Sequence, residues 1–191
     1  MPNLWVTVFC GSKLGRRPIF AETARKLGTY LAANDLGLVY GGGHVGTMGV
    51  IADAVLAGGG KVSGVITEGL AGKEIAHQGL TNLMVVSDMA IRKSELISQG
   101  DISLTLPGAF GTLDEFFEVV TLHQLCYHTK RCLLLNLDGY YTDLMKALSR
   151  MVSEGFLERR HFEIIEVVET VESLFDILEA VAAEARETEV A

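Results

Sequence analysis

The chain has 191 residues, of which 49% are hydrophobic and 3 are prolines, enough for one domain with a sizeable core. The net charge of −8 and the pI of about 5.1 exclude the basic surface that binding to nucleic acid requires. The apolar runs stop far short of the ~20 residues of a membrane span. We expect a protein that binds neither nucleic acid nor membrane. Because the first residues show no signal-peptide pattern, we also expect a cytoplasmic location.

Six apolar runs rich in β-branched residues predict buried strands. They cover Leu4–Cys10, Gly37–Tyr40, Lys61–Ile66, Leu83–Val86, Ile102–Leu106 and Cys132–Leu137. Helical patterns alternate with them at Phe20–Ala33, Thr47–Ala57, Met89–Gln99, Thr112–Leu125, Tyr141–Glu154 and about Val171–Ala185. This alternation predicts βαβ units. The expected fold is α/β: a single Rossmann-like domain over residues 1–191, with a doubly wound parallel sheet, helices on both faces and a frayed acidic tail at about 186–191.

Four glycine-rich or polar segments follow predicted strands, namely CGSKLG, YGGGHVG, VSDMAIRK and LPGAFGT. In open parallel sheets, ligands bind beyond the carboxyl ends of the strands, near the point where the strand order reverses. Glycine-rich turns that enter a helix also let backbone amides approach a phosphate. Since all four segments fall at the same edge of the predicted sheet, we expect the ligand site there.

The segment GGGHVG has Gly41, Gly43 and Gly46 in the GxGxxG spacing, and Glu68 follows the next strand. This pattern occurs in dinucleotide-binding proteins, so an oxidoreductase that binds NAD or NADP is one alternative. A tight strand-to-helix turn without a ligand is another. The loop follows the second predicted strand rather than the first, and a dinucleotide site leaves the second glycine loop, PGAFGT, without a role.

Glu115 has two interpretations. Thr112 and Glu115 match the S/T-x-x-E capping box, in which each side chain bonds an amide of the first helical turn. Alternatively, the loop amides hold a phosphate and Glu115 takes part in chemistry. Asp114, Glu115 and Glu118 place more negative charge at this helix start than one cap requires. One of these acids could therefore act as a general base or stabilise a cation in a cleft.

Arg92 and Lys93 fall in the first turns of the preceding predicted helix, which Ser87 or Asp88 caps. The helix dipole favours cations at the opposite end. The unfavourable position indicates a function for these cations, with a solvated surface pair as the alternative.

Cys10, Cys126 and Cys132 are odd in number and form no CxxC motif, which indicates free thiols. His123, Cys126 and His128 are close in sequence, but on one continuous helix the two histidines would lie on different faces. A zinc site needs three or four converging ligands. We therefore predict no metal. We also predict no cofactor, and no motif provides a site for pyridoxal phosphate.

Taken together, YGGGHVGTMG, DMAIRK and LPGAFGTLDE resemble the Lonely Guy family of cytokinin-activating phosphoribohydrolases, whose members are often mislabelled lysine decarboxylases. The hallmarks of that family are a PGGxGTxxE motif and an MxxRK segment, which here read Pro107 to Glu115 and Met89 to Lys93. The likeness covers about Val6 to Leu157. One departure is Ala109, which replaces the second glycine of PGG. A positive φ at this alanine would cost about 1 kcal/mol or more.

The resemblance implies a homodimer that hydrolyses the N-glycosidic bond of an N6-substituted adenosine 5′-monophosphate, releasing the free base and ribose 5-phosphate. It implies that Arg92 and Glu115 form the catalytic pair. A nearby carboxylate stabilises the oxocarbenium-like state of such a reaction. Glu115 could hold the ribose hydroxyls or orient the attacking water, and Arg92 could bind phosphate or assist departure of the base. The expected substrate-binding residues are Glu74, Lys93, Gly108, Ala109, Gly111, Thr112 and Thr121, to which the GGGHVG loop adds Gly42 and Gly43. A non-catalytic nucleotide-binding or carrier protein of the same fold is the alternative, for which Ala109 is the one hint.

Overall fold

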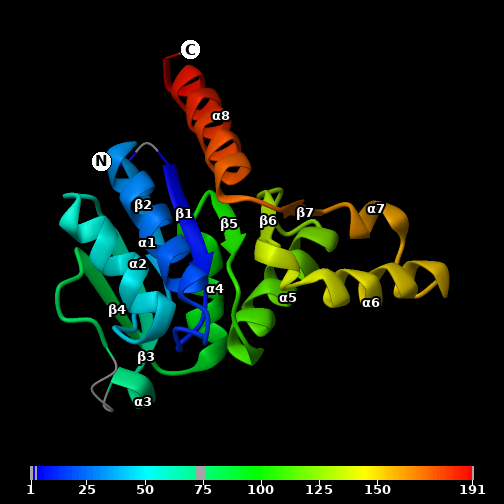
Figure 1. The fold of residues 1–191 in the computed structure, drawn as a ribbon, viewed down its shortest axis with the longest axis horizontal. Helices are drawn as coiled ribbons and strands as arrows, with labels where there is room; N and C mark the ends of the chain where they lie inside the picture. The colour runs from blue at the N-terminus through cyan, green and yellow to red at the C-terminus, as the bar shows by residue number, and fades with distance from the viewer. Residues whose placement is uncertain (1, 3, 72–75, 191) are drawn as a thin grey trace.

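Seven parallel strands form one sheet in the order β4-β3-β2-β1-β5-β6-β7 (Figure 1). The computed structural model describes residue 2, residues 4–71 and residues 76–190. The strands are β1 (Leu4–Phe9), β2 (Leu36–Tyr40), β3 (Val62–Thr67), β4 (Asn82–Val86), β5 (Ile102–Thr105), β6 (Cys132–Leu135) and β7 (Ile165–Val168). The helices are α1 (Pro18–Ala33), α2 (Gly46–Ala57), α3 (Glu68–Ala71), α4 (Met89–Gln99), α5 (Phe110–Gln124), α6 (Thr142–Ser153), α7 (Arg159–Phe162) and α8 (Val171–Val190), with a 3-10 helix, η1, at Leu137–Gly139.

Helices cover both faces of the sheet, as the continuous apolar strands predict. Helices α1, α2 and α8 pack on one face, where Leu31 and Leu174 are fully buried. Helices α4, α5 and α6 pack on the other face, around Phe116. Successive residues of β1 alternate between these cores: Val8 belongs to the first and Phe9 to the second. The Rossmann-like α/β prediction is confirmed.

The strand order reverses at β1, which pairs with β2 on one side and with β5 on the other. Val8 lies opposite Tyr40 of β2 and Leu104 of β5. Just beyond the strands, the amide of Leu106 donates to the carbonyl of Phe9 at 2.9 Å. The loops that follow β1 and β5 therefore lie side by side at the carboxyl edge of the sheet, where ligands bind in open α/β folds.

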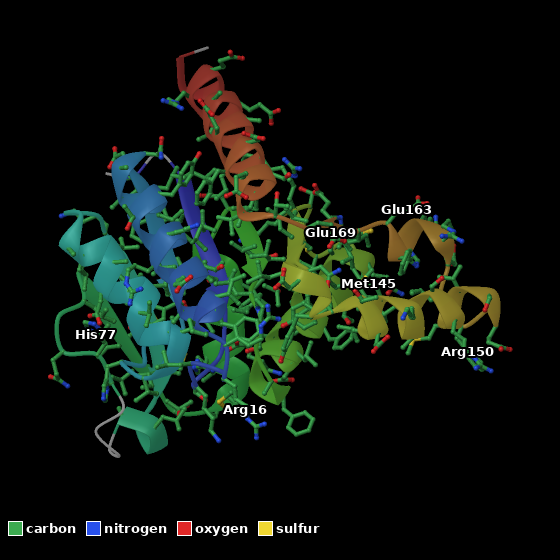
Figure 2. All side chains as sticks on the ribbon, in the orientation of Figure 1. Arg16, His77, Met145, Arg150, Glu163 and Glu169 are labelled. Carbon is green, nitrogen blue, oxygen red and sulfur yellow. The ribbon has the colours of Figure 1, made fainter. Side chains whose placement is uncertain are left out.

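Some elements differ from the predicted ones. No strand was predicted at Ile165–Val168, which forms β7 at the edge of the sheet. The last helix was expected to end at about Ala185 and to be followed by a frayed tail, whereas α8 continues to Val190. Helices α6 and α7 extend sideways from the sheet as an arm, with Arg150 near its outer end and His77 on the opposite side of the molecule (Figures 1 and 2). In the described part of the chain, no helix is long and apolar enough to cross a membrane.

Candidate active site

A buried ion pair joins Arg92 and Glu115. Arg92 Nη1 donates to Glu115 Oε1 at 2.9 Å, and the two residues are 7% and 8% exposed. Arg92 comes from α4 and Glu115 from α5, so the pair links two helices on the same face of the sheet. Arg92 Nε also donates to the carbonyl of Val65 at 2.9 Å, and Nη2 donates to that of Gly41 at 3.2 Å. One carboxylate and two backbone carbonyls thus fix the guanidinium.

Packing accounts for the outer glycines of the GxGxxG pattern. A Cβ at Gly41 would lie 2.2 Å from Arg92 Nη2, so the arginine occupies the space of a side chain there. Gly46 has a φ of +63°, and a Cβ on it would lie 2.3 Å from the backbone nitrogen of Lys13. Gly41 therefore admits the arginine, and Gly46 allows the loop after β1 to approach α2.

Burial raises the pKa of Glu115 to about 6, against an ordinary value of 4.5. The charge of Arg92 and its hydrogen bond oppose this effect without cancelling it. A carboxyl group with a pKa near neutrality can exchange a proton or act as a charged stabiliser under physiological conditions.

The other two acids at the start of α5 pair with Lys93. Its Nζ lies 3.1 Å from Asp114 Oδ1 and 2.5 Å from Glu118 Oε2, and these carboxylates raise the pKa of Lys93. Arg92 thus pairs with one acid of α5 and Lys93 with the other two, which accounts for the three carboxylates near the start of this helix. Of the two predicted caps, Ser87 and Asp88, it is Asp88 that caps α4, through hydrogen bonds from the amides of Ala90 and Ile91.

The capping-box interpretation of Glu115 is wrong. Helix α5 begins at Phe110, so Ala109 occupies the N-cap position and no side chain caps the helix. Thr112 therefore lies inside the first turn, and the carboxylate of Glu115 contacts Arg92 instead of a cap amide. Ala109 has a φ of −115°, so alanine takes this position without the cost of a left-handed conformation.

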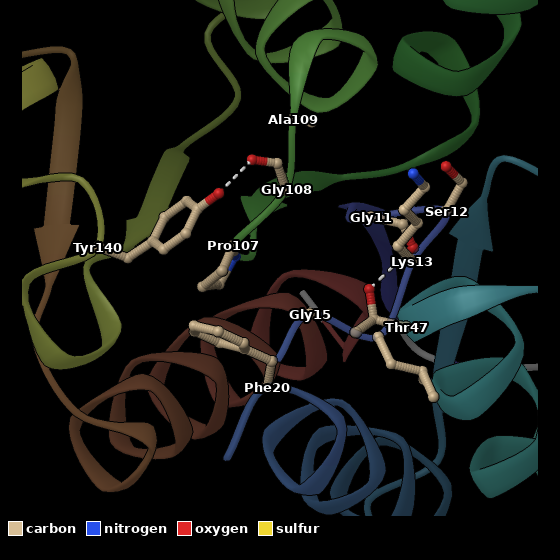
Figure 3. Close-up of a pocket in the computed structure, with 11 residues that line it drawn as sticks. Gly11, Ser12, Lys13, Gly15, Phe20, Thr47, Pro107, Gly108, Ala109 and Tyr140 are labelled. Carbon is tan, nitrogen blue, oxygen red and sulfur yellow. Dashed lines mark hydrogen bonds between the residues drawn. The ribbon is translucent and has the colours of Figure 1, made fainter. Parts of the chain in front are cut away.

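The uncapped start of α5 borders a cavity of about 250 Å³ (Figure 3). Within the described residues, the amides of 109–112 donate to no protein acceptor. Free amides at a helix N-terminus attract anions, because their dipoles point toward the ligand. The lining residues come from the loops after β1 and β5 and from three neighbouring elements: Gly11, Ser12, Lys13, Leu14, Gly15, Phe20, Thr47, Pro107, Gly108, Ala109 and Tyr140.

The remaining predicted binding residues lie in different surroundings. Gly42 accepts a hydrogen bond from the amide of His77 at 2.9 Å, and Gly43 forms an antiparallel bridge with Ala76. These glycines thus hold Ala76 and His77. Thr121 is exposed on α5, and a six-residue separation turns it about 240° around the helix from Glu115.

Two further predicted residues complete this set. A Cβ at Gly111 would meet no atom within 4 Å, so open space adjoins the first turn of α5. Glu74 lies outside the described residues.

Sequence reasoning missed Tyr140, Phe20 and Lys13 as lining residues. The signal for Lys13 was present, because CGSKLG follows a strand at the same edge as the other loops. Tyr140 follows β6 at this edge too, in the segment LLNLDGYY, but nothing in its local pattern indicates that it reaches the loop after β5. Only the pairing of β5 with β6 brings the two segments together.

The prediction that His123 and His128 lie on different faces of one helix is also wrong. Because α5 ends at Gln124 and Cys126 has a φ of +62°, the chain turns back and the two rings lie 5.4 Å apart. Each ring is within hydrogen-bond distance of a backbone carbonyl, His123 of Lys130 and His128 of Val119. Among the described residues, no three His, Cys, Asp or Glu side chains are arranged to hold a metal ion, and the cysteines are free.

Solved structures share this fold at low sequence identity. The molybdenum cofactor carrier protein of Chlamydomonas reinhardtii superposes with a TM-score of 0.72 over 94% of this chain and 98% of its own, at 17% identity. The molybdenum cofactor binding protein of Rippkaea orientalis has a TM-score of 0.70 over 93% of this chain and 96% of its own, at 18% identity. At these identities the likeness supports the fold alone.

Sequence relatives are more specific. The family model described as possible lysine decarboxylase matches residues 48–178. A cytokinin riboside 5′-monophosphate phosphoribohydrolase of Rhodococcoides fascians is 46% identical, over 80% of this chain and 77% of its own. A probable enzyme of the same name from Oryza sativa subsp. japonica is 43% identical, over 84% of this chain and 72% of its own. These matches include the segments that contain Arg92, Glu115 and the start of α5, and on their strength the chain belongs to the cytokinin riboside 5′-monophosphate phosphoribohydrolase family.

Proposed function

We propose that this protein hydrolyses the N-glycosidic bond of a nucleoside 5′-monophosphate, with N6-substituted adenosine 5′-monophosphate as the substrate class. Water adds its hydroxyl group to C1′ of the ribose and its proton to the departing base, which gives the free base and ribose 5-phosphate. The relatives named above support this activity. The observation that carries it in this chain is the buried Arg92–Glu115 pair, in which Glu115 belongs to the helix whose uncapped start suits a phosphate.

In this proposal, the 5′-phosphate binds to the backbone amides at the start of α5, including those of Ala109, Gly111 and Thr112, and to the preceding loop at Gly108. The ionised carboxylate of Glu115 stabilises the positive charge that develops on the ribose as the bond breaks. Arg92 is held on two backbone carbonyls and on Glu115, so its role is to hold that carboxylate in place and to lower its pKa. The charge of Lys93, the next residue of α4, also lowers the pKa of Glu115.

The two alternative functions, a non-catalytic carrier and a dinucleotide-binding oxidoreductase, lose the observations that favoured them. Ala109 was the one hint of a non-catalytic carrier, and its negative φ leaves the amide in place. A dinucleotide site was based on the GxGxxG pattern and Glu68. Gly41 instead accommodates Arg92, and Glu68 begins the short helix α3.

The direct test is to incubate the protein with isopentenyladenosine monophosphate and with AMP and to measure released base by chromatography. Glu115→Gln keeps an acceptor for Arg92 but removes the charge, and we expect turnover to fall by about 10²- to 10³-fold. Glu166→Gln is the matched control, because Glu166 pairs with Arg131 at the edge strand β7; its turnover should be unchanged. No base release by the wild type from either substrate would contradict the proposed function.

The assembly and the location are also proposals. We propose a homodimer, supported by exposed apolar side chains on α5, where Phe110 is 91% and Phe117 is 37% exposed. We further propose a cytoplasmic location without nucleic acid or membrane partners, which agrees with the acidic composition. Cell fractionation tests the location, and the oligomeric state is considered in the Discussion.

A further inference from the structure

Two adjacent tyrosines donate hydrogen bonds to the loop between β5 and α5. The hydroxyl of Tyr140 donates to the carbonyl of Gly108 at 2.7 Å, which is drawn in Figure 3. The hydroxyl of Tyr141 donates to the carbonyl of Leu106 at 2.9 Å. Both tyrosines follow η1. The two bonds are alike in chemistry and differ in the peptide group that they hold.

The bond from Tyr140 holds a peptide group that has a free N–H. The carbonyl of Gly108 and the N–H of Ala109 belong to one planar trans peptide, in which the two groups point in opposite directions. With the carbonyl held by Tyr140, the amide of Ala109 must point away from that hydroxyl. The bond from Tyr141 holds the peptide between Leu106 and Pro107, which has no N–H, and the same hydroxyl also interacts with the backbone of Gly108.

Gly108 makes such a restraint necessary. A Cβ at this position would lie 2.1 Å from Thr112 Oγ1, so only glycine fits beneath the first turn of α5. Glycine is also the residue whose backbone rotates most freely, and the peptide that follows it is free to reorient unless its carbonyl is bonded. The hydroxyl of Tyr140 supplies that bond.

Tyr140 itself is held in place on several sides. Its ring packs edge-on against Phe20, with centroids 5.6 Å apart, and against Tyr141 at 4.8 Å. The backbone of Tyr141 donates to Asn136 Oδ1 at 2.7 Å, and Asn136 Nδ2 lies 3.0 Å from a carboxylate oxygen of Glu169. The tyrosine is therefore a fixed support at the wall of the cavity, although 46% of its surface is exposed.

We propose that Tyr140 is a positioning residue for the phosphate subsite: its hydroxyl fixes the Gly108–Ala109 peptide so that the amide of Ala109 donates to the phosphate group of the ligand. This inference rests on the proposed function for the identity of the ligand. It assigns the tyrosine no contact with the reacting bond. Its effect should therefore appear in the affinity for phosphate-containing ligands and in KM rather than in kcat.

The experiment compares Tyr140→Phe with Tyr30→Phe. Titration calorimetry measures the Kd of ribose 5-phosphate, and steady-state kinetics with AMP and isopentenyladenosine monophosphate give KM and kcat. We expect Tyr140→Phe to raise Kd and KM about 10-fold, since a hydrogen bond to a charged group is lost from its aligned geometry. Its kcat should change by less than about 2-fold, since the ring and its packing remain.

Tyr30→Phe is the matched control, because the hydroxyl of Tyr30 also donates to a backbone carbonyl, that of Phe175 at 3.0 Å, and this bond joins α1 to α8 rather than holding the loop between β5 and α5. Its loss should lower Tm while the Kd of ribose 5-phosphate stays at the wild-type value. Tyr127→Phe, at a tyrosine that is 76% exposed, serves as a second control.

Three results would overturn the proposal: an unchanged Kd in Tyr140→Phe, an equal rise in Kd in both control and test variants, or no binding of ribose 5-phosphate by the wild type. Because calorimetry needs no turnover, failure of the proposed hydrolysis is separable. A wild type that releases no base, yet binds ribose 5-phosphate in a Tyr140-dependent manner, contradicts the hydrolysis and supports the positioning role.

Discussion

Opposing electrostatic effects act on the carboxyl group of Glu115. Removal from water favours its neutral form, while the guanidinium of Arg92 favours its ionised form, and the balance leaves the pKa at about 6. Asp114 adds to the upward shift, and Lys93 opposes it. The neighbours of this carboxyl group therefore determine the pH at which it becomes charged.

We predict that kcat/KM falls as the pH drops through about 6, because the proposed role needs the ionised carboxylate and kcat/KM reports groups of the free enzyme. Asp114→Asn removes a negative charge that raises the pKa of Glu115, so the acidic limb of the profile should move to lower pH. The measurement is kcat/KM for AMP from pH 4.5 to 8. A limb that moves to higher pH in Asp114→Asn would rule out Glu115 as the titrating group.

The same shift predicts a pH dependence of stability. The folded-state pKa of Glu115 lies above its unfolded value of 4.5, so its contribution is fully present below pH 4.5 and is lost as the pH rises through about 6. The loss amounts to about 2 kcal/mol. Relative to Glu115→Gln, the wild type should therefore become less stable by this amount between pH 4 and pH 7. Urea unfolding of both proteins at these pH values measures it, and a difference that does not vary with pH would contradict the shift.

At the scale of elements, α4 carries both proposed cations and depends on one cap. Asp88 Oδ1 accepts from the amides of Ala90 and Ile91 at 2.9 and 3.0 Å. We predict that Asp88→Ala lowers the free energy of unfolding by about 1 kcal/mol, whereas Asp88→Asn, which keeps an acceptor, lowers it much less. Thermal unfolding of the two variants makes the comparison. Equal losses would indicate that the negative charge at the helix start, rather than the hydrogen bonds of the cap, is what Asp88 contributes.

The elements that were predictable from sequence are those whose pattern is local. Helix α4 has the predicted bounds, because an aspartate cap and a C-terminal glycine mark its ends. Strand β7 was missed because it is short, interrupted by Glu166 and stabilised by pairing with β6. The start of α5 was placed at Thr112 rather than Phe110, since the capping-box pattern competes with a helix start that no side chain caps.

For the candidate site, proximity in the sheet was predictable and individual contacts were not. The rule that loops gather at the carboxyl edge brought Arg92 and Glu115 into one hypothesis. It could not reveal that Arg92 occupies the space above Gly41, or that Tyr140 reaches Gly108. Those contacts depend on side-chain direction across neighbouring strands, which a single sequence does not specify.

At the scale of the whole molecule, we predict a dimer that uses the exposed face of α5. Phe110 and Phe117 lie seven residues apart and so share one side of the helix, and exposed apolar surface of this kind marks interfaces. Light scattering after size exclusion should give about twice the 20.7 kDa of one chain. Phe117→Asp should shift the mass to that of a monomer, whereas Phe156→Asp, at a residue 90% exposed near the end of the arm, should not. A monomeric wild type would refute the dimer.

The position of β1 between β2 and β5 has a consequence for synthesis. Its amide at Trp5 bonds the carboxylate of Asp101, 96 residues later in the chain. A ribosome adds about 5–20 residues per second, so one edge of β1 waits on the order of ten seconds before its neighbour emerges. During that interval the nascent chain presents an open strand edge, the feature that invites wrong pairing. We therefore expect wrong pairing of this edge to be most frequent while β5 has yet to emerge, and slower synthesis to lengthen that interval.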